Sequence, residues 1–287
     1  MRLGAVGVML AGALALAGCT SEEDRGDGPS TDASRSDSAF DEVLAADVRA
    51  KDRARDQYRN PAETLAFFQV APDHTVIEYA PGGGWYTRIL APFVAENGRY
   101  RAVGFAPGSA SSLGEDVVER VRERGRTFSA RLSKMLELPA DKLPYLASSE
   151  LPEDVVGTVD RVLIFRTMHN LKRFGIAEAE IKSMFDALKP GGMLGVVQHR
   201  AKDDAPSSYV DGNKGYLKQS ELTQLIESTG FELVEASEIN ANPRDTADYP
   251  GGVWTLPPSF AKGDEDREKY AEIGESDRMT LLFKKPE

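Results

Sequence analysis

A carboxylate followed by a glycine-rich loop is the clearest chemical feature of this sequence. Residues 75–79 (TVIEY) read as a buried strand containing Glu78, and residues 80–84 (APGGG) form a loop before a helical pattern. Glycines let the backbone approach a ligand closely, and a helix N-terminus offers unpaired N–H groups and a positive dipole end. This pattern is how an α/β fold builds a cofactor site at the carboxyl end of a strand. A glycine turn that binds nothing is the alternative.

The three histidines differ in their predicted positions. His74 precedes the first strand, away from the expected site, whereas His169 follows one strand and His199 ends another. We therefore expect His169 and His199 at the carboxyl edge of the sheet, where such sheets bind ligands. A histidine that is neutral near pH 7 can remove a proton from a nucleophile, and His169 is the first candidate. The alternative is that each histidine only satisfies loop hydrogen bonds.

Two arginines accompany these histidines in the sequence. Arg166 and Arg200 follow the same two strands, and we expect them to form a cationic rim with His199 that orients an anionic acceptor. The candidate catalytic residues are therefore His169, His199 and Arg166. We predict no metal site.

Strands and helices alternate after residue 72. The predicted strands are 76–77, 100–105, 145–147, 162–165, 193–197, 231–236 and 279–283, and the predicted helices are 85–94, 117–124, 176–188 and 217–228. This alternation predicts an α/β fold, a doubly wound, mostly parallel seven-stranded sheet covered on both faces. The last two strands are expected to form an antiparallel pair at one edge.

The N-terminus reads as a lipoprotein signal. Residues 1–19 combine Arg2, an apolar run too short for a comfortable membrane span and the sequence LAGC ending at Cys19. This ending resembles the cleavage box of bacterial lipoproteins, which implies a lipid on Cys19 and a place in the cell envelope. An uncleaved anchor is the alternative. The polar, acidic residues 20–39 are expected to be a disordered tether, and residues 40–287 the folded domain.

The start of this domain has a helical pattern. Arginine and aspartate alternate through residues 51–56, which usually indicates a solvated helix face. Asn60, Pro61 and Glu63 then have the order of a helix cap, first position and capping-box acid.

Charge and cysteine content narrow the function classes. The 287 residues carry a formal net charge of −11, which argues against a nucleic-acid partner because phosphate binding needs a basic face. The single cysteine excludes an intramolecular disulfide.

Residues 240–277 form a long insertion between the last two strands. Loops of this length are usually functional or disordered, and the aromatics and prolines here argue against disorder. We expect a lid over the carboxyl edge of the sheet, with Tyr209 and Tyr216 beside the same opening. A packing flap is the alternative.

Several ordered motifs carry a family resemblance. Residues 78–84 (EYAPGGG), 160–165 (DRVLIF) and 188–192 (LKPGG) resemble the class I S-adenosylmethionine-dependent methyltransferases. Residues 80–87 (APGGGWYT), 166–170 (RTMHN) and 274–279 (GESDRM) resemble a bacterial group of exported, predicted methyltransferases. The resemblance covers the chain from about residue 56 onwards.

The resemblance implies S-adenosylmethionine as the cofactor. Glu78, Gly82 and Gly84 fall where the family contacts the methionine moiety, and a carboxylate there can receive its ammonium. The full set of implied cofactor residues is Glu78, Ala80, Pro81, Gly82, Gly83, Gly84, Tyr86 and Thr87. A dinucleotide is disfavoured, because Thr87 takes the third glycine position and the acid precedes the loop.

One departure concerns the ribose. The family usually places an acid at the end of the second strand, but residues 103–107 read VGFAP. Ser148, Ser149 and Glu150 are candidates for the adenine end, or are loop residues facing water. The predicted function is methyl transfer to a small molecule, and the alternative is a catalytically silent binding protein that keeps the fold.

Overall fold

The computed structural model describes residues 39–105 and 114–287. The predicted signal and the tether up to residue 38 lie outside these residues, as do Ala106 and Pro107 from the region without a ribose acid. Among the described residues, no helix combines the length and the apolar character needed to cross a membrane.

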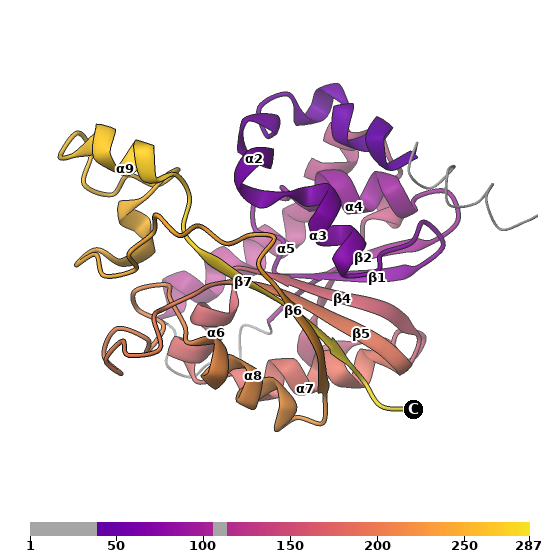
Figure 1. The fold of residues 1–287 in the computed structure, drawn as a ribbon. Helices are drawn as coiled ribbons and strands as arrows, with labels where there is room; N and C mark the ends of the chain where they lie inside the picture. Colours follow the sequence, from indigo (N-terminus) through magenta and orange to yellow (C-terminus); the bar gives the residue numbers. More distant parts are fainter. Residues whose placement is uncertain (1–38, 106–113) are drawn as a thin grey trace, which may run out of the picture.

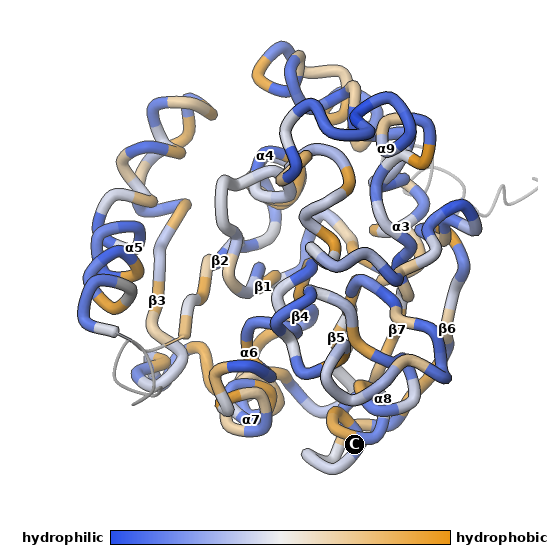
Figure 2. The backbone as a smooth tube through the Cα atoms, turned by 90° about the vertical axis from the view of Figure 1, so that its left-hand side faces the viewer, coloured by the Kyte–Doolittle hydropathy of each residue, from blue (hydrophilic) through white to orange (hydrophobic). Residues whose placement is uncertain are grey.

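Seven strands form one sheet. They are β1 (Thr75–Tyr79), β2 (Arg99–Gly104), β3 (Tyr145–Ala147), β4 (Val159–Phe165), β5 (Leu188–His199), β6 (Glu232–Ser237) and β7 (Arg278–Lys284). Their order is β3-β2-β1-β4-β5-β7-β6, as Figure 2 shows from one end of the sheet. Strands β1 to β5 pair in parallel, and β7 runs antiparallel to both β5 and β6. The predicted fold class is confirmed, with the antiparallel strand one position in from the edge.

Helices cover both faces of this sheet. The α-helices are α2 (Asp56–Arg59), α3 (Pro61–Phe67), α4 (Thr87–Val94), α5 (Glu115–Leu136), α6 (Met168–Phe174), α7 (Ala177–Ala187), α8 (Gln219–Glu227) and α9 (Arg267–Ile273). Short 3-10 helices are η1 (Asp47–Arg49), η2 (Arg53–Arg55), η3 (Ala140–Lys142), η4 (Ser148–Glu150) and η5 (Gly252–Thr255). Figure 1 shows α3 and α4 on one face and α6, α7 and α8 on the other.

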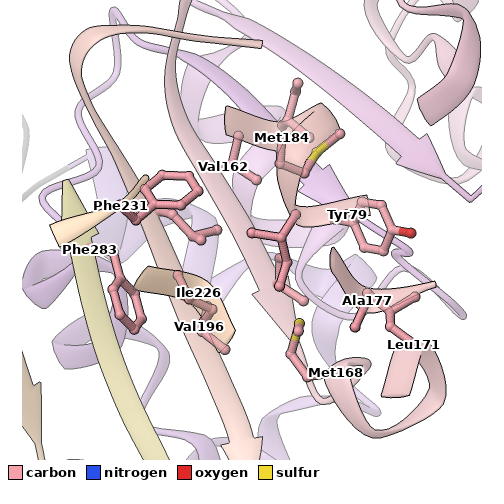
Figure 3. Packing of buried hydrophobic residues seen from close by; sticks show 14 of the residues in the cluster. Tyr79, Val162, Met168, Leu171, Ala177, Met184, Val196, Ile226, Phe231 and Phe283 are labelled. Atoms are coloured by element: carbon pink, nitrogen blue, oxygen red, sulfur yellow. The ribbon is translucent and has the colours of Figure 1, made fainter. Parts of the chain in front are cut away.

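Alternation along β1 decides where its carboxylate lies. Ile77 and Tyr79 join the core beneath α6 to α8, part of which Figure 3 shows, whereas Val76 packs with α3, α4 and α5. Because successive strand side chains point to opposite faces, Glu78 shares the face of Val76. The carboxylate is therefore directed beneath α4, at the carboxyl end of β1.

The N-terminal segment differs from its prediction. Of the residues predicted to form a solvated face, Lys51, Arg53 and Ala54 are exposed, whereas Asp52, Arg55 and Asp56 are partly buried. Asp52 forms an ion pair with Arg88, so the prediction holds for half of the segment. Asn60 precedes α3 but makes no cap hydrogen bond, because its side-chain amide donates instead to the carbonyl of Ile239. The partly buried half is explained by partners that lie farther along the chain, since Asp52 pairs with Arg88 and Arg55 pairs with Glu275.

Candidate functional site

A cavity of about 510 Å³ opens at the carboxyl edge of the parallel strands. Its walls come from the loop after β1, the turn after β4, the end of β5, residues 52–59 and residues of the 240–277 insertion. Figure 1 shows the insertion with α9 beyond this edge of the sheet. The cavity thus lies where the topology of an open α/β sheet favours a ligand.

The two central strands end in the same unusual way. Ala80 after β1 and Arg166 after β4 both have positive φ, 50° and 55°. Both residues still hydrogen-bond to the neighbouring strand. The Ala80 N–H donates to the carbonyl of Val103 and the Arg166 N–H to the carbonyl of Val197, both at 2.7 Å. A non-glycine residue in this left-handed region costs about 1–3 kcal/mol, and such strain clusters at functional sites. The strained turns separate the chains leaving β1 and β4, which lead to opposite faces of the sheet.

Glu78 is a buried carboxylate without a cation. It is 2% exposed, and its Oε2 accepts hydrogen bonds from Thr87 Oγ1 and from the Tyr100 hydroxyl, both at 2.7 Å. No ion pair reaches it within the described residues. Burial raises the pKa of Glu78 to about 7, because the two hydroxyls only partly offset desolvation. The cavity therefore presents an acid that gains from a bound cation.

The implied cofactor residues separate into two groups. Six line the cavity: Glu78, Ala80, Pro81, Gly82, Gly83 and Tyr86. Gly84 and Thr87 lie behind them. A Cβ on Gly84 would come within 3.2 Å of Leu132, and Thr87 is fully buried against Glu78. Thr87 therefore holds the carboxylate in place and does not face the cavity.

Tyr86 forms the floor beside the strand ends. Its ring stacks on Phe165 with centroids 3.5 Å apart and an interplanar angle of 7°. Its hydroxyl donates to the carbonyl of Arg59 at 3.5 Å. This arrangement joins the glycine loop, the end of β4 and the N-terminal segment into one wall.

The structure brings His169 and His199 together in the cavity wall. Their ring centroids are 5.8 Å apart, and both side chains are buried. Burial lowers the pKa of His169 to about 4, and burial together with nearby arginines lowers that of His199. His199 Nδ1 forms a 2.5 Å hydrogen bond with Ser276 Oγ, which orients its ring. Both imidazoles are therefore neutral at pH 7 and able to accept a proton or a hydrogen bond.

Arg166 lines the cavity without a partner among the described residues. Its guanidinium makes no ion pair and no hydrogen bond there, although the side chain is half-buried. Burial, followed by the positive charge of Arg278, lowers the pKa of Arg166 to about 10. It remains a cation at neutral pH, held beside other cations.

Glu275 collects three further arginines. It accepts from Arg55 Nε at 2.5 Å and from Arg59 Nε at 3.4 Å, and Arg278 forms a third ion pair with it. Burial opposes ionisation of Glu275, but these arginines outweigh it and hold its pKa at about 2. One carboxylate thus links the N-terminal segment, the insertion and β7.

Two arginine side chains make cation–π contacts with the ring of Trp85. The guanidinium of Arg59 lies 4.5 Å from its ring centroid, and that of Arg49 lies 5.2 Å away. Such cation–π contacts are worth about 0.5–2 kcal/mol each. They fix an aromatic wall next to the glycine loop.

Residues of the insertion contribute the opposite wall. Val253, Trp254, Pro257 and Pro258 line the cavity, and the Trp254 ring lies edge-on to His169 with centroids 5.9 Å apart. The insertion is thus in contact with the predicted base.

Some predicted neighbours lie elsewhere. Arg200 pairs with Glu238 and Asp277 in a separate depression of about 790 Å³, apart from Arg166 and His199. The predicted cationic rim of three residues is therefore wrong, because Arg200 lies elsewhere and His199 is neutral. Tyr216 is buried, and its hydroxyl donates to Asp245, so this ring packs beneath the insertion and not beside the opening. Tyr209 stacks on Tyr216 outside the cavity.

The candidates for an adenine site also lie outside this cavity. Ser148 to Glu150 form η4, and the carbonyl of Ser148 accepts from Ser183 Oγ at 2.6 Å. Ser148 is buried, whereas Ser149 and Glu150 face water.

The sequence analysis missed Arg55, Arg59, Glu275 and Arg278 as site residues. The residues paired through Glu275 are 216 and 220 positions apart, so no local pattern joins them. The motif at 274–279 contained the signal, since it holds Glu275, Ser276 and Arg278.

Comparison with solved structures identifies the fold. A geranyl diphosphate methyltransferase in complex with GPP and sinefungin has a TM-score of 0.50 at 15% identity, covering 79% of this chain and 77% of its own. The [4+2]-cyclase SpnF has a TM-score of 0.50 at 16% identity, covering 84% and 85%. A SAM dependent methyltransferase from Aquifex aeolicus gives 0.49 at 16% identity, covering 81% and 93%. No protein-family model matches the chain, and no curated protein matches it. The chain has the class I methyltransferase fold.

Proposed function

We propose that this protein transfers a methyl group from S-adenosylmethionine to a small-molecule acceptor. The observation that carries the proposal is the buried, unpaired carboxylate of Glu78 beside an open glycine loop, at the switch point of this sheet. A similar structure was solved with sinefungin, an analogue of S-adenosylmethionine, which supports the choice of cofactor.

The residues of the loop fit the methionine end of the cofactor. Glu78 would receive the ammonium group, a charge-assisted contact that relieves its unfavourable burial. A Cβ on Gly83 would meet nothing within 4 Å, so the loop backbone is open to the cavity. When bound, S-adenosylmethionine would supply an electrophilic methyl group on its sulfonium, and both electrons of the broken carbon–sulfur bond would stay on sulfur.

The chain's own residues then position the acceptor and take its proton. Methyl transfer is an in-line displacement, so orientation supplies much of the rate. His169 and His199 are neutral and line the cavity, and either can accept a proton from an oxygen or nitrogen nucleophile. The bond to Ser276 leaves only Nε2 of His199 free for this role.

A catalytically silent binding protein is the second candidate. No observation on the described residues favours it over an enzyme, and the similarity to a [4+2]-cyclase shows only that a protein of this fold is named for a reaction other than methyl transfer. Fold alone therefore does not define the chemistry of the site.

A steric variant tests cofactor binding directly. Gly83→Leu adds a side chain at an exposed loop position that lines the cavity, where a Cβ meets no protein atom within 4 Å, so we expect normal thermal stability and loss of S-adenosylhomocysteine binding in calorimetry. Ala261→Leu, at an exposed position outside the cavity, is the matched control. No binding to the wild type at millimolar ligand would refute the methyltransferase proposal, and unchanged binding to Gly83→Leu would refute the location.

We also propose that the protein is attached to a bacterial envelope membrane through a lipid on Cys19. The support is the apolar run ending in LAGC and the single cysteine at this position.

A further inference from the structure

The cavity has more positive charge than its internal acids neutralise. Five arginines line it, at positions 55, 59, 88, 166 and 278, against three carboxylates at 52, 78 and 275. This is an excess of two positive charges in a protein whose formal net charge is −11. Arg88 is matched by Asp52, and Glu78 lies on β1 beside the glycine loop, so the other four arginines share the single carboxylate of Glu275.

Buried donors in this region lack acceptors. Arg59 Nη1, Trp85 Nε1 and Arg278 Nε are each inaccessible to solvent and make no hydrogen bond within the described residues. Arg59 and Arg278 are both only 2% exposed. A buried donor without a partner costs about 1–3 kcal/mol, and more for a charged group. These three atoms are closed off from the cavity, so they add unbalanced positive potential beside Arg166, whose guanidinium makes no hydrogen bond in the described part of the chain.

The proposed cofactor cannot balance this positive potential. Its methionine end has one carboxylate, its ammonium is assigned to Glu78, and its sulfonium adds another positive charge. Binding S-adenosylmethionine therefore increases the excess charge of the cavity. Positive charges held close together in a low-dielectric site repel strongly, so a second, negatively charged ligand is needed.

We infer that the methyl acceptor carries a carboxylate or phosphate group, held by Arg166 together with Arg59 and Arg278. This inference rests on the proposed function. Planar guanidinium groups bind both anions in a bidentate manner, so the shared chemistry is an oxyanion. Arg166 is the primary contact, because it has no internal partner, whereas Arg59 and Arg278 are already oriented by Glu275. Trp85 and Trp254 also line the cavity, so an apolar part of the acceptor could contact their rings.

Intrinsic fluorescence provides the test, since both tryptophans of the chain line the cavity. The full-length protein is titrated with inorganic phosphate and with succinate, each alone and with saturating S-adenosylhomocysteine. We expect one of these anions to bind with the product present, at an affinity no weaker than without it. Loss of anion binding in the presence of S-adenosylhomocysteine would overturn the inference, because the arginines would then hold the cofactor carboxylate. Failure of both anions to bind at tens of millimolar would overturn it as well.

Charge variants locate the subsite. We expect Arg166→Gln to weaken binding of the anion about tenfold or more, and Arg166→Lys, which keeps the charge, to weaken it less. Arg126→Gln removes an arginine from the exposed face of α5 and should leave the affinity within about twofold. Thermal melts establish that each variant is folded. Unchanged affinity for the anion in folded Arg166→Gln overturns the inference. A separate titration of the wild type with S-adenosylhomocysteine tests the proposed function, and absence of binding there refutes it.

Discussion

Replacing Glu78 with glutamine should stabilise the unliganded protein and weaken cofactor binding at the same time. The carboxylate is 2% exposed and interacts with hydroxyl groups but with no cation in the described part of the chain. Glutamine has nearly the same shape, and its amide oxygen can accept hydrogen bonds from Thr87 and Tyr100 without a charge. The variant therefore removes the cost of a buried charge and little else.

The size of this effect follows from the pKa of Glu78. Burial raises it from an ordinary 4.5 to about 7, and each pH unit corresponds to about 1.4 kcal/mol. Because the folded-state pKa is raised, the favourable contribution is complete below pH 4.5 and is lost as the pH rises through 7. The wild type thus loses about 3 kcal/mol over this range, and the non-titrating variant does not.

Urea and thermal unfolding at two pH values measure the difference. At pH 8 we expect the variant to unfold roughly 5–10 °C above the wild type, and at pH 4 the two should agree within about 0.5 kcal/mol. Glu232→Gln changes an exposed carboxylate on β6 and should show neither effect. A less stable variant at pH 8, or the same difference at both pH values, would contradict the physical account of this site.

The same variant then tests function. A charge-assisted hydrogen bond contributes about 1.5–3 kcal/mol, so S-adenosylhomocysteine should bind at least about tenfold more weakly to Glu78→Gln. Increased stability with reduced affinity is typical of a residue retained for binding. Unchanged affinity would remove Glu78 from the ammonium site.

Three further predictions concern other parts of the chain. Glu275→Gln leaves three arginines uncompensated and should lower the free energy of unfolding by about 3 kcal/mol at pH 7. Because the folded-state pKa of Glu275 is about 2, the difference from the wild type in urea unfolding should shrink as the pH falls from 4.5 to 2. Equal stability of the two proteins at pH 7 would contradict this prediction. Binding of sulfate, an oxyanion that does not itself titrate near pH 6, should be accompanied by proton uptake at that pH, since neutralising Arg278 and Arg166 raises the pKa of His199; calorimetry in two buffers of different ionisation enthalpy measures this, and proton release would count against it. Cys19→Ser should move the protein from the membrane fraction to the soluble fraction and abolish lipid labelling, and retention of the label would exclude Cys19 as its site.

Much of the fold follows from local patterns. The apolar runs predicted all seven strands, and the antiparallel pairing of β6 with β7 is confirmed. The helix around 117–124 was underestimated, because α5 continues through Gly125 to Leu136. A Cβ at Gly125 would come within 2.9 Å of the Tyr145 ring, so this glycine permits close packing of α5 against β3. The sequence alone does not show that Gly125 is retained inside a helix for close packing, so the glycine looks like a helix end.

Only part of the candidate site could be predicted from the sequence. Glu78 and the loop after it follow from a strand, a turn and a helix that are adjacent along the chain. Arg55 and Arg59 instead belong to a charged segment whose alternation suggested contact with water. Arg59 is buried and Arg55 is partly exposed, and both pair with Glu275, which comes from the far end of the chain. Local charge patterns do not distinguish a solvated helix from one covered by a distant insertion.

Glu78 and Glu275, two of the three acids that line the cavity, show what this tertiary arrangement achieves. Glu78 has only hydroxyl partners and a pKa of about 7, whereas Glu275 has three arginines and a pKa of about 2. Carboxylates whose environments separate their pKa values in this way have different roles. One end of the cavity therefore gains from a bound cation, and the other, with Arg166 unpaired, gains from a bound anion. A cationic methyl donor and an anionic acceptor match these two ends, and neither could exchange places with the other without leaving both sets of charges unsatisfied.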